Sequence, residues 1–205
     1  MKKMEKYLKG IALILMMIGI SSIGYTQATY KIQDNNGVSL KIKGTSSLHD
    51  WEMDANRAKE GEAQFIFNEQ NESELTSMKS LTFTLEVYAL KGESKGLDNN
   101  AYKALRADKN KYITYKLTSA TESAEKGGYL VKTKGKLTIA GVTKDIAMDI
   151  HLVVNKNKSV TLKGSYQLKM SDYKVEPPSF MMGMMTTGDT IKLNFEVTYI
   201  KQNEG

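Results

Sequence analysis

The chain has no cysteine among its 205 residues. It therefore can form no disulfide, no zinc–thiolate site, no thiol nucleophile and no lipid link to a lipobox cysteine. Proline is almost as rare, since the two prolines stand together at Pro177 and Pro178. Long period-two strands can run through the rest of the chain without a proline interrupting them.

The sequence also has no apolar run long enough to span a membrane. The stretch from Ile11 to Ile23 is shorter than the ~20 residues that a spanning helix needs, and Ser21 and Ser22 interrupt it. It follows a lysine-rich start and precedes the small-residue exit at Thr26 to Ala28, the order found in secretory signal peptides. We expect residues 1–28 to be a signal peptide cleaved near Ala28, with one exported domain over residues 29–205 in a bacterial periplasm. An uncleaved N-terminal anchor is the weaker alternative.

A concentrated positive charge is the third feature that the sequence does not show. Residues 1–28 carry four Lys and one Glu, a net charge of +3. Since the full chain has a net charge of +6, residues 29–205 have a net charge of +3. The remaining lysines are scattered among acidic residues along the expected strands. This pattern indicates a solvated outer surface and no nucleic-acid partner.

The strongest structural signal lies between Tyr129 and Val154, where apolar residues alternate with polar ones on both sides of Ala140-Gly141. A two-residue turn at Ala140-Gly141 pairs position i with position 281 − i and places both apolar sets on one face. The same register sets Lys132 opposite Asp149 and Lys136 opposite Asp145. We therefore predict a long hairpin within a large sheet.

Similar alternation occurs along most of the remaining chain. We expect strands at Val38–Lys43, Glu52–Ala58, Ala63–Phe67, Leu81–Tyr88, Ile113–Leu117, Val160–Leu168 and Ile191–Thr198, with a polar loop at 68–76. Apolar parity around the loop near Asn155 to Ser159 requires an odd length, three or five residues. One short helix is expected between Leu97 and Asn110, capped by Asp98 or Asn99.

About eight to ten such strands in one open sheet would leave an apolar face wet and two edges exposed. Closure removes both faults, so the expected fold class is all-β, an extended antiparallel barrel of about eight strands with one short helix. A barrel of this size can be solid or can hold one slender ligand. Gly135 and Gly164 fall on the inward parity, which favours space inside.

Several of these segments resemble the YceI-like proteins. The resemblance rests on Ala101-Tyr-Lys-Ala-Leu-Arg-Ala-Asp-Lys before Tyr112-Ile-Thr-Tyr, on Gly135-Lys-Leu-Thr-Ile-Ala-Gly-Val-Thr-Lys144 and on Glu176-Pro-Pro-Ser. It implies an exported, lipocalin-like barrel whose apolar channel takes a polyisoprenoid, an isoprenoid quinone or a similar amphiphilic lipid, with no catalytic residues and no other cofactor. The YceI-like proteins usually have a histidine early in the first strand. This chain has none within Val38–Lys43, and the segment Ser-Leu-His-Asp-Trp follows that strand instead. Whether the protein forms a homodimer is left open.

The inward parity and the apolar loop after Pro178 provide the candidate binding residues. We expect the channel wall to comprise Phe83, Leu85, Val131, Met148, Ile150, Tyr166, Leu193 and Phe195, and the lid to comprise Phe180, Met181 and Met184. At the barrel mouth, His49 and Trp51 are candidates for contact with a ligand headgroup. The alternative, which we favour, is a structural turn in which Asp50 bonds to the backbone and Trp51 plugs the barrel end.

Two other functions compete with lipid binding. The methionines of the loop, Met181, Met182, Met184 and Met185, are thioethers that favour Cu(I), so a periplasmic copper-binding protein is the alternative function. Methionine is equally suited to adaptable apolar surfaces, and no fixed metal site is expected. A solid barrel that acts only through protein contacts is the other alternative.

Overall fold

The computed structural model describes residues 26–34, 37–180 and 185–202. Nearly all of the predicted signal peptide therefore lies outside the described residues. The elements, in chain order, are the strands β1 (Thr26–Ile32), β2 (Val38–Ser46), β3 (Trp51–Ala55), β4 (Glu60–Asn68), β5 (Asn71–Glu86), β6 (Lys91–Gly92), β7 (Tyr112–Glu125), β8 (Gly128–Ile139), β9 (Val142–Val154), β10 (Val160–Lys169), β11 (Ser179–Phe180) and β12 (Met185–Lys201), with helix α2 (Lys95–Ala104) between β6 and β7 and short 3-10 turns at Val87–Ala89 and Ser171–Tyr173.

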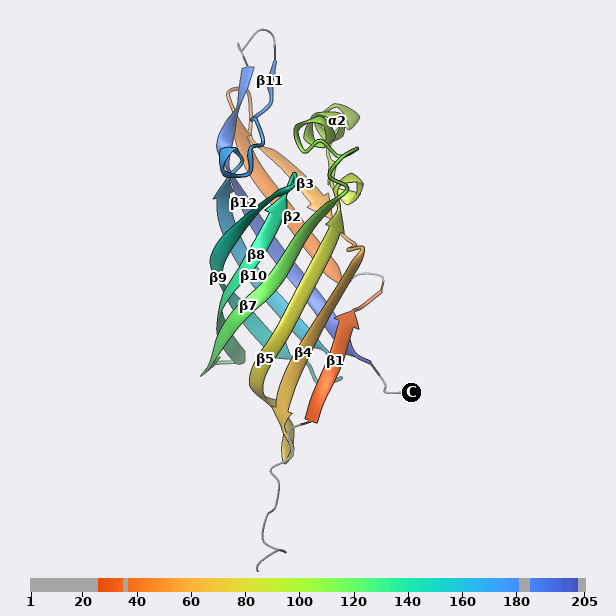
Figure 1. The fold of residues 1–205 in the computed structure, drawn as a ribbon, viewed down its shortest axis with the longest axis vertical. Helices are drawn as coiled ribbons and strands as arrows, with labels where there is room; N and C mark the ends of the chain where they lie inside the picture. Colours follow the sequence, from red (N-terminus) through yellow and green to blue (C-terminus); the bar gives the residue numbers. More distant parts are fainter. Residues whose placement is uncertain (1–25, 35–36, 181–184, 203–205) are drawn as a thin grey trace, which may run out of the picture.

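Eight strands close into a ring in the order β1-β4-β5-β7-β8-β9-β10-β12, and β12 pairs back to β1. The predicted antiparallel barrel is therefore confirmed. β12 is long enough to pair with β1 through Tyr199–Lys201 and with β2 through Thr187–Val197. β2 then continues the sheet to β3 and β6, so the barrel is longer than its ring (Figure 1).

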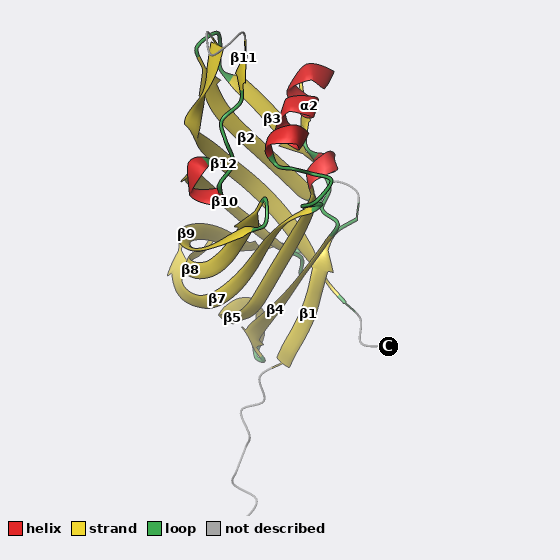
Figure 2. Ribbon diagram, turned by 45° about the horizontal axis from the view of Figure 1, so that its top comes forward, coloured by secondary structure: helices red, strands yellow, loops and turns green. Residues whose placement is uncertain are grey.

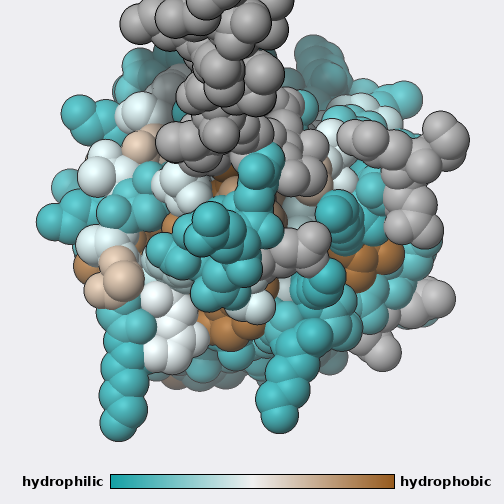
Figure 3. Space-filling model, turned by 90° about the horizontal axis from the view of Figure 1, so that it is seen from below, coloured by the Kyte–Doolittle hydropathy of each residue, from teal (hydrophilic) through white to brown (hydrophobic). Residues whose placement is uncertain are grey.

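Figures 1 and 2 show an elongated barrel with two different ends. Helix α2, β11 and the loop between β2 and β3 lie at the upper end in Figure 1. The β4–β5 and β7–β8 turns and the C-terminus lie at the lower end. The part of the lower end that is visible in Figure 3 is mainly hydrophilic, with small hydrophobic areas between.

The β8–β9 hairpin has the predicted register. Val131 lies opposite Ile150 and Lys132 opposite Asp149, so each pair of positions sums to 281. Ala140 and Gly141 have φ values of 51° and 80°, the two positive angles of a type I′ turn. Lys136 Nζ lies 2.8 Å from Asp145 Oδ1. The following loop, residues 155–159, has five residues, as parity required, because Val154 pairs with Val160.

Two local predictions were wrong. Residues 68–76 are not a loop, because β4 and β5 pair as far as Asn68 and Asn71. Helix α2 begins at Lys95, and its N-cap is neither Asp98 nor Asn99 but Ser94, whose Oγ accepts a hydrogen bond from the Leu97 amide at 3.2 Å.

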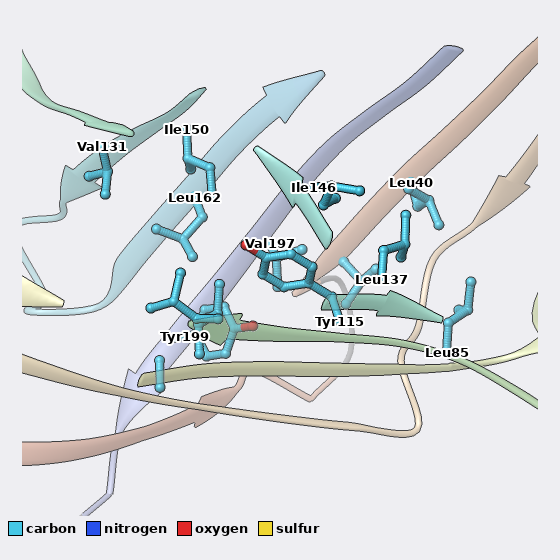
Figure 4. Packing of buried hydrophobic residues seen from close by; sticks show 14 of the residues in the cluster. Leu40, Leu85, Tyr115, Val131, Leu137, Ile146, Ile150, Leu162, Val197 and Tyr199 are labelled. Atoms are coloured by element: carbon cyan, nitrogen blue, oxygen red, sulfur yellow. The ribbon is translucent and has the colours of Figure 1, made fainter. Parts of the chain in front are cut away.

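The inward faces of the strands meet in one apolar core (Figure 4). Val131 and Ile150 are both fully buried, so the predicted parity holds. The lower part of the barrel is packed by aromatic rings: the Tyr30 and Phe65 ring centroids lie 5.0 Å apart, and those of Phe65 and Tyr199 lie 6.5 Å apart.

The inward glycines do not leave empty space as we expected. A Cβ on Gly135 would lie 2.5 Å from Cζ of Tyr115, and a Cβ on Gly164 would lie 2.6 Å from Cζ of Phe195. An aromatic ring therefore covers each glycine, and internal space must come from elsewhere. In the part of the chain described, no helix has both the length and the apolar character required to cross a bilayer.

Candidate functional site

A cavity of about 510 Å³ runs from the upper end of the barrel down to Tyr199. This volume falls within the ~300–1,000 Å³ of typical small-molecule pockets. Its lining comes mainly from the inward apolar residues of β2, β5, β7 to β10 and β12. Leu48, His49 and Glu93 also line it and are strongly exposed, so the cavity meets solvent at the upper end, between the β2–β3 loop and α2.

Most of the predicted wall residues line this cavity. They are Phe83, Leu85, Met148, Ile150, Tyr166, Leu193 and Phe195. Val131 does not line it, although its side chain is fully buried. Val131 belongs to the packed lower part of the barrel, and its predicted contact with a ligand has no support in this arrangement.

The predicted lid lies largely outside the described residues. Met181 and Met184 fall in the gap at 181–184, and Phe180 is described only as a backbone position in β11, opposite Met185. β11 stands at the upper end of the barrel, where a lid would be needed (Figure 1). The lid therefore remains a prediction.

The Ser46 hydroxyl holds the turn at the cavity mouth, a structural role that the sequence did not predict. Ser46 Oγ donates to the His49 carbonyl at 2.7 Å and accepts from the amides of Leu48 and His49 at 3.2 Å each. Asp50, the residue expected to fix this turn, makes none of these bonds. A serine hydroxyl that accepts from the amides two and three residues later forms an ST-turn. Ser46 at this point of the sequence was a signal for such a turn.

Trp51 and His49 both line the cavity near its mouth, and their contact with a ligand headgroup remains a prediction. The Trp51 ring packs against Gly44, and its Nε1 donates to the Thr45 carbonyl at 3.2 Å. His49 Nε2 lies 4.0 Å from Glu93 Oε1. Both rings line the cavity, so the face of an indole ring, an imidazole and a carboxylate are available to a polar headgroup at its entrance.

Helix α2 covers one side of the mouth with its apolar face, a role that the sequence did not reveal. Leu97, Ala101, Ala104 and Leu105 line the cavity with the i, i+3, i+4 spacing of one helical face. The helix is tied to the chain before it, because Asp98 Oδ1 accepts from the Gly92 amide at 2.7 Å and Tyr102 OH donates to the Leu90 carbonyl at 2.7 Å.

The interior offers few polar atoms. Tyr115 OH lies 3.4 Å from Thr133 Oγ1, which donates to the Met148 carbonyl at 2.8 Å. Tyr173 OH is buried without a hydrogen-bond partner among the described residues, and burial raises the pKa of Tyr173 to about 12, so the group stays a neutral donor at pH 7.

Ionisable groups are sparse along the cavity. Glu93 and His49, both at the mouth, are the only carboxylate and imidazole among its described lining residues, and no lysine or arginine is among them. No group of three or more His, Asp or Glu side chains arranged to hold a metal occurs in the described ranges. The arrangement can enclose an apolar molecule and hydrogen-bond to its polar end.

The fold and the cavity define an antiparallel barrel with an elongated apolar interior, the class of barrel that can enclose a slender ligand. The chain belongs to the YceI-like family, because the model of the YceI-like domain matches residues 22–199. The family prediction from the sequence is thus confirmed.

Solved structures show the same fold. BcnA of Burkholderia cenocepacia is similar with a TM-score of 0.60 at 16% identity over 78% of this chain and 95% of that one. A polyisoprenoid binding domain from Saccharophagus degradans gives 0.60 at 10% identity over 86% and 100%. The YCEI protein of Campylobacter jejuni gives 0.53 at 24% identity over 72% and 84%. The comparison with curated proteins found no match.

Proposed function

We propose that the protein is a non-enzymatic binding protein that encloses a polyisoprenoid or a similar amphiphilic lipid in its barrel. The observation that carries this proposal is the cavity of about 510 Å³, whose lining is apolar apart from a few hydroxyl groups and the polar residues at its mouth. Each methylene buried there contributes ~0.8 kcal/mol, so a long isoprenoid binds without a strong polar contact.

The two ends of the cavity differ in a way that orients such a ligand. Aromatic rings pack the lower part of the barrel, and the polar groups of Ser46, His49 and Glu93 stand at the upper mouth. An amphiphile therefore enters tail first and leaves its headgroup, a quinone ring for example, beside His49 and Trp51. The Saccharophagus degradans structure, described as a polyisoprenoid binding domain, shares this fold and supports the proposal.

We also propose that the protein is exported and works in a periplasm. This rests on the basic start, the short apolar run and the small-residue exit of residues 1–28. Transport, storage and stress protection are all processes that a soluble carrier of an insoluble lipid could serve.

Mass spectrometry of lipid extracted from the purified protein tests the binding proposal. We expect a co-purified isoprenoid, or uptake of an added isoprenoid quinone if the protein is isolated empty. Met148→Trp, which fills part of the cavity, should reduce uptake at least tenfold. Ala147→Trp places the same bulk on the exposed outer face of the same strand and should not. A protein that stays empty and takes up no isoprenoid would rule the proposal out and leave the solid-barrel alternative.

Copper binding is the competing function that the sequence suggests, through the methionines of 181–185. An anaerobic Cu(I) titration separates it from lipid binding. If Cu(I) binding is unchanged after Met181, Met182, Met184 and Met185 are all replaced by Leu, the loop is not a copper site.

A further inference from the structure

We propose that the upper end of the barrel docks on an anionic phospholipid bilayer through the outer side of α2 and the segment that follows it. The docking face comprises Lys95, Lys103, Lys109, Lys111 and Tyr112, with Leu48 on the other side of the mouth. The use that we assign to this docking, exchange of the ligand with a membrane, rests on the proposed function. The docking face itself does not.

Exposed apolar side chains gather at this end. Four large hydrophobic side chains are exposed in the described residues. Leu48 (69%) belongs to the β2–β3 loop, Tyr88 (46%) to the 3-10 turn before β6 and Tyr112 (42%) to the start of β7, all elements of the upper end, whereas Ile200 (37%) belongs to the end of β12 near the C-terminus. Tyr88 lies on the side of the mouth that α2 covers, because its ring packs edge-on against that of Tyr102 in α2, with 4.8 Å between the ring centroids. Tyrosine is favoured at the headgroup level of a bilayer, where its ring is half buried and its hydroxyl stays wet.

The same side carries a concentration of positive charge. Residues 91–111 contain six basic and three acidic residues. The acidic groups are already engaged: Asp98 lies 3.6 Å from Lys91 Nζ, Asp108 accepts from Tyr88 OH at 2.7 Å, and Glu93 is beside His49. The net charge of this region is therefore positive.

Four lysines of this region present their amino groups to solvent. Lys95, Lys103, Lys109 and Lys111 are exposed, and none of the hydrogen bonds or ion pairs within the described residues uses their amino groups. The expectation of scattered lysines without a patch was therefore wrong for this end of the molecule. The fold places Lys95 and Lys103 on α2, whose apolar face lines the cavity, and Lys109 and Lys111 in the short segment that leads from α2 to β7.

Charge also selects which side of the mouth faces the lipid. The opposite side, formed by the segments before β11 and at the start of β12, carries three acidic residues, Asp172, Glu176 and Asp189, against one lysine, Lys174, and is net negative. An anionic surface attracts the helix side and repels the other, so the barrel would dock tilted, with α2 against the headgroups. The cavity mouth then lies at the membrane surface, and an insoluble ligand can pass between bilayer and barrel without crossing water.

Co-sedimentation with vesicles tests the docking face. The purified protein should bind vesicles of phosphatidylcholine that contain phosphatidylglycerol, bind pure phosphatidylcholine far more weakly, and dissociate as salt is raised. The variant Lys95→Glu/Lys103→Glu/Lys109→Glu/Lys111→Glu should weaken binding by about a hundredfold or more, since each basic residue near an anionic surface adds a multiplicative factor.

A matched variant isolates position from net charge. Lys116→Glu/Lys126→Glu/Lys134→Glu/Lys156→Glu changes the charge equally, at exposed positions on the wall and the lower turns. It should lose clearly less affinity for the vesicles. Leu48→Ser should also weaken binding more than Ile200→Ser. Equal losses in the two quadruple variants, or no preference for phosphatidylglycerol, would overturn the proposal.

Uptake of an isoprenoid quinone from detergent solution separates this proposal from the proposed function. None of the four lysines of the docking face lines the cavity, so the first variant should take up ligand as the natural protein does while failing to bind vesicles. If uptake falls together with vesicle binding, the docking face has no separate role and the proposal fails. If the natural protein binds vesicles but takes up no isoprenoid, docking stands and lipid carriage falls.

Discussion

At the scale of a single residue, Tyr173 tests whether a polar group in the cavity wall lacks a hydrogen-bond partner. Its hydroxyl is buried without a partner among the described residues, and an unpaired buried hydroxyl costs stability. We expect Tyr173→Phe to raise the free energy of unfolding of the ligand-free protein by about 1 kcal/mol. Chemical denaturation of the two proteins, stripped of lipid, measures this difference.

The control for this change is Tyr199→Phe, which removes a hydroxyl that donates to the Thr82 carbonyl at 3.4 Å. Losing that bond should lower the free energy of unfolding by up to about 1 kcal/mol. If Tyr173→Phe destabilises the protein as much as Tyr199→Phe does, the Tyr173 hydroxyl has a partner such as bound water and the expectation is wrong.

Other single residues show what the alternation of apolar and polar positions can predict and what it cannot. The period-two pattern correctly placed both Val131 and Ile150 on the inner face. It could not place Val131 below the cavity, because parity fixes the face of a strand and not the depth along the barrel axis. Parity also could not predict that the Phe195 ring packs over Gly164. Phe195 lies directly opposite Gly164 on β12, and that pairing depends on a register between strands far apart in sequence.

At the scale of elements, the β8–β9 turn allows a matched test of what holds a hairpin in place. Gly141 has φ of 80°, and a Cβ there would lie 2.8 Å from Asn110 Oδ1. Gly127, in the β7–β8 turn, has φ of 89°, and beyond its two chain neighbours no residue has an atom within 4 Å of such a Cβ. Gly127→Ala therefore meets only the backbone cost of a left-handed residue, about 1–2 kcal/mol.

We expect Gly141→Ala to lower the free energy of unfolding by more than Gly127→Ala does, because the contact with Asn110 is added to the same backbone cost. Urea unfolding of both variants measures the difference. Asn110→Ala removes the contact together with the bonds from Asn110 Nδ2 to the Leu105 and Arg106 carbonyls, so Gly141→Ala should cost less when it is added to Asn110→Ala than when it is added to the natural protein. Equal losses in the two single variants would show that the segment carrying Asn110 yields without cost.

The elements also show why the first half of β5 was predicted as a loop, although its second half was predicted as a strand. β4 and β5 shift register between Gln64 and Phe65 and again between Ile66 and Phe67. These bulges place the buried residues of the first part of β5 at Leu75, Met78 and Leu81, three apart, so the period-two signal disappears there although the strand continues. Helix α2 was recognised by its spacing, but its cap was misplaced because three capping residues, Ser94, Asp98 and Asn99, compete within six positions.

At the scale of the whole molecule, the barrel is packed at one end and hollow at the other. The sequence predicted closure, since an open sheet of this size would expose too much apolar surface. It did not predict where the space lies, because that depends on rings such as Tyr115 and Tyr30 that fold inward from several strands at once. The β1–β12 seam that closes the ring spans only three residue pairs, against six between β1 and β4.

Hydrogen exchange of the whole barrel should report this division. Without ligand, amides around the mouth, in residues 46–51 and in α2, should exchange fastest among the structured parts, because they cover a hollow and few packed side chains hold them. The β8 and β9 amides near Val131 and Ile150 should exchange slowest.

A bound isoprenoid fills the cavity, and at a hundredfold excess over its Kd it stabilises the folded, ligand-bound state by about 2.7 kcal/mol. Exchange in α2 and residues 46–51 should then slow up to about a hundredfold, with a smaller change in the seam between β1 and β12. Mass spectrometry of peptic fragments, with and without an isoprenoid quinone, measures this, and protection confined to the lower end would mean that the ligand does not occupy the cavity.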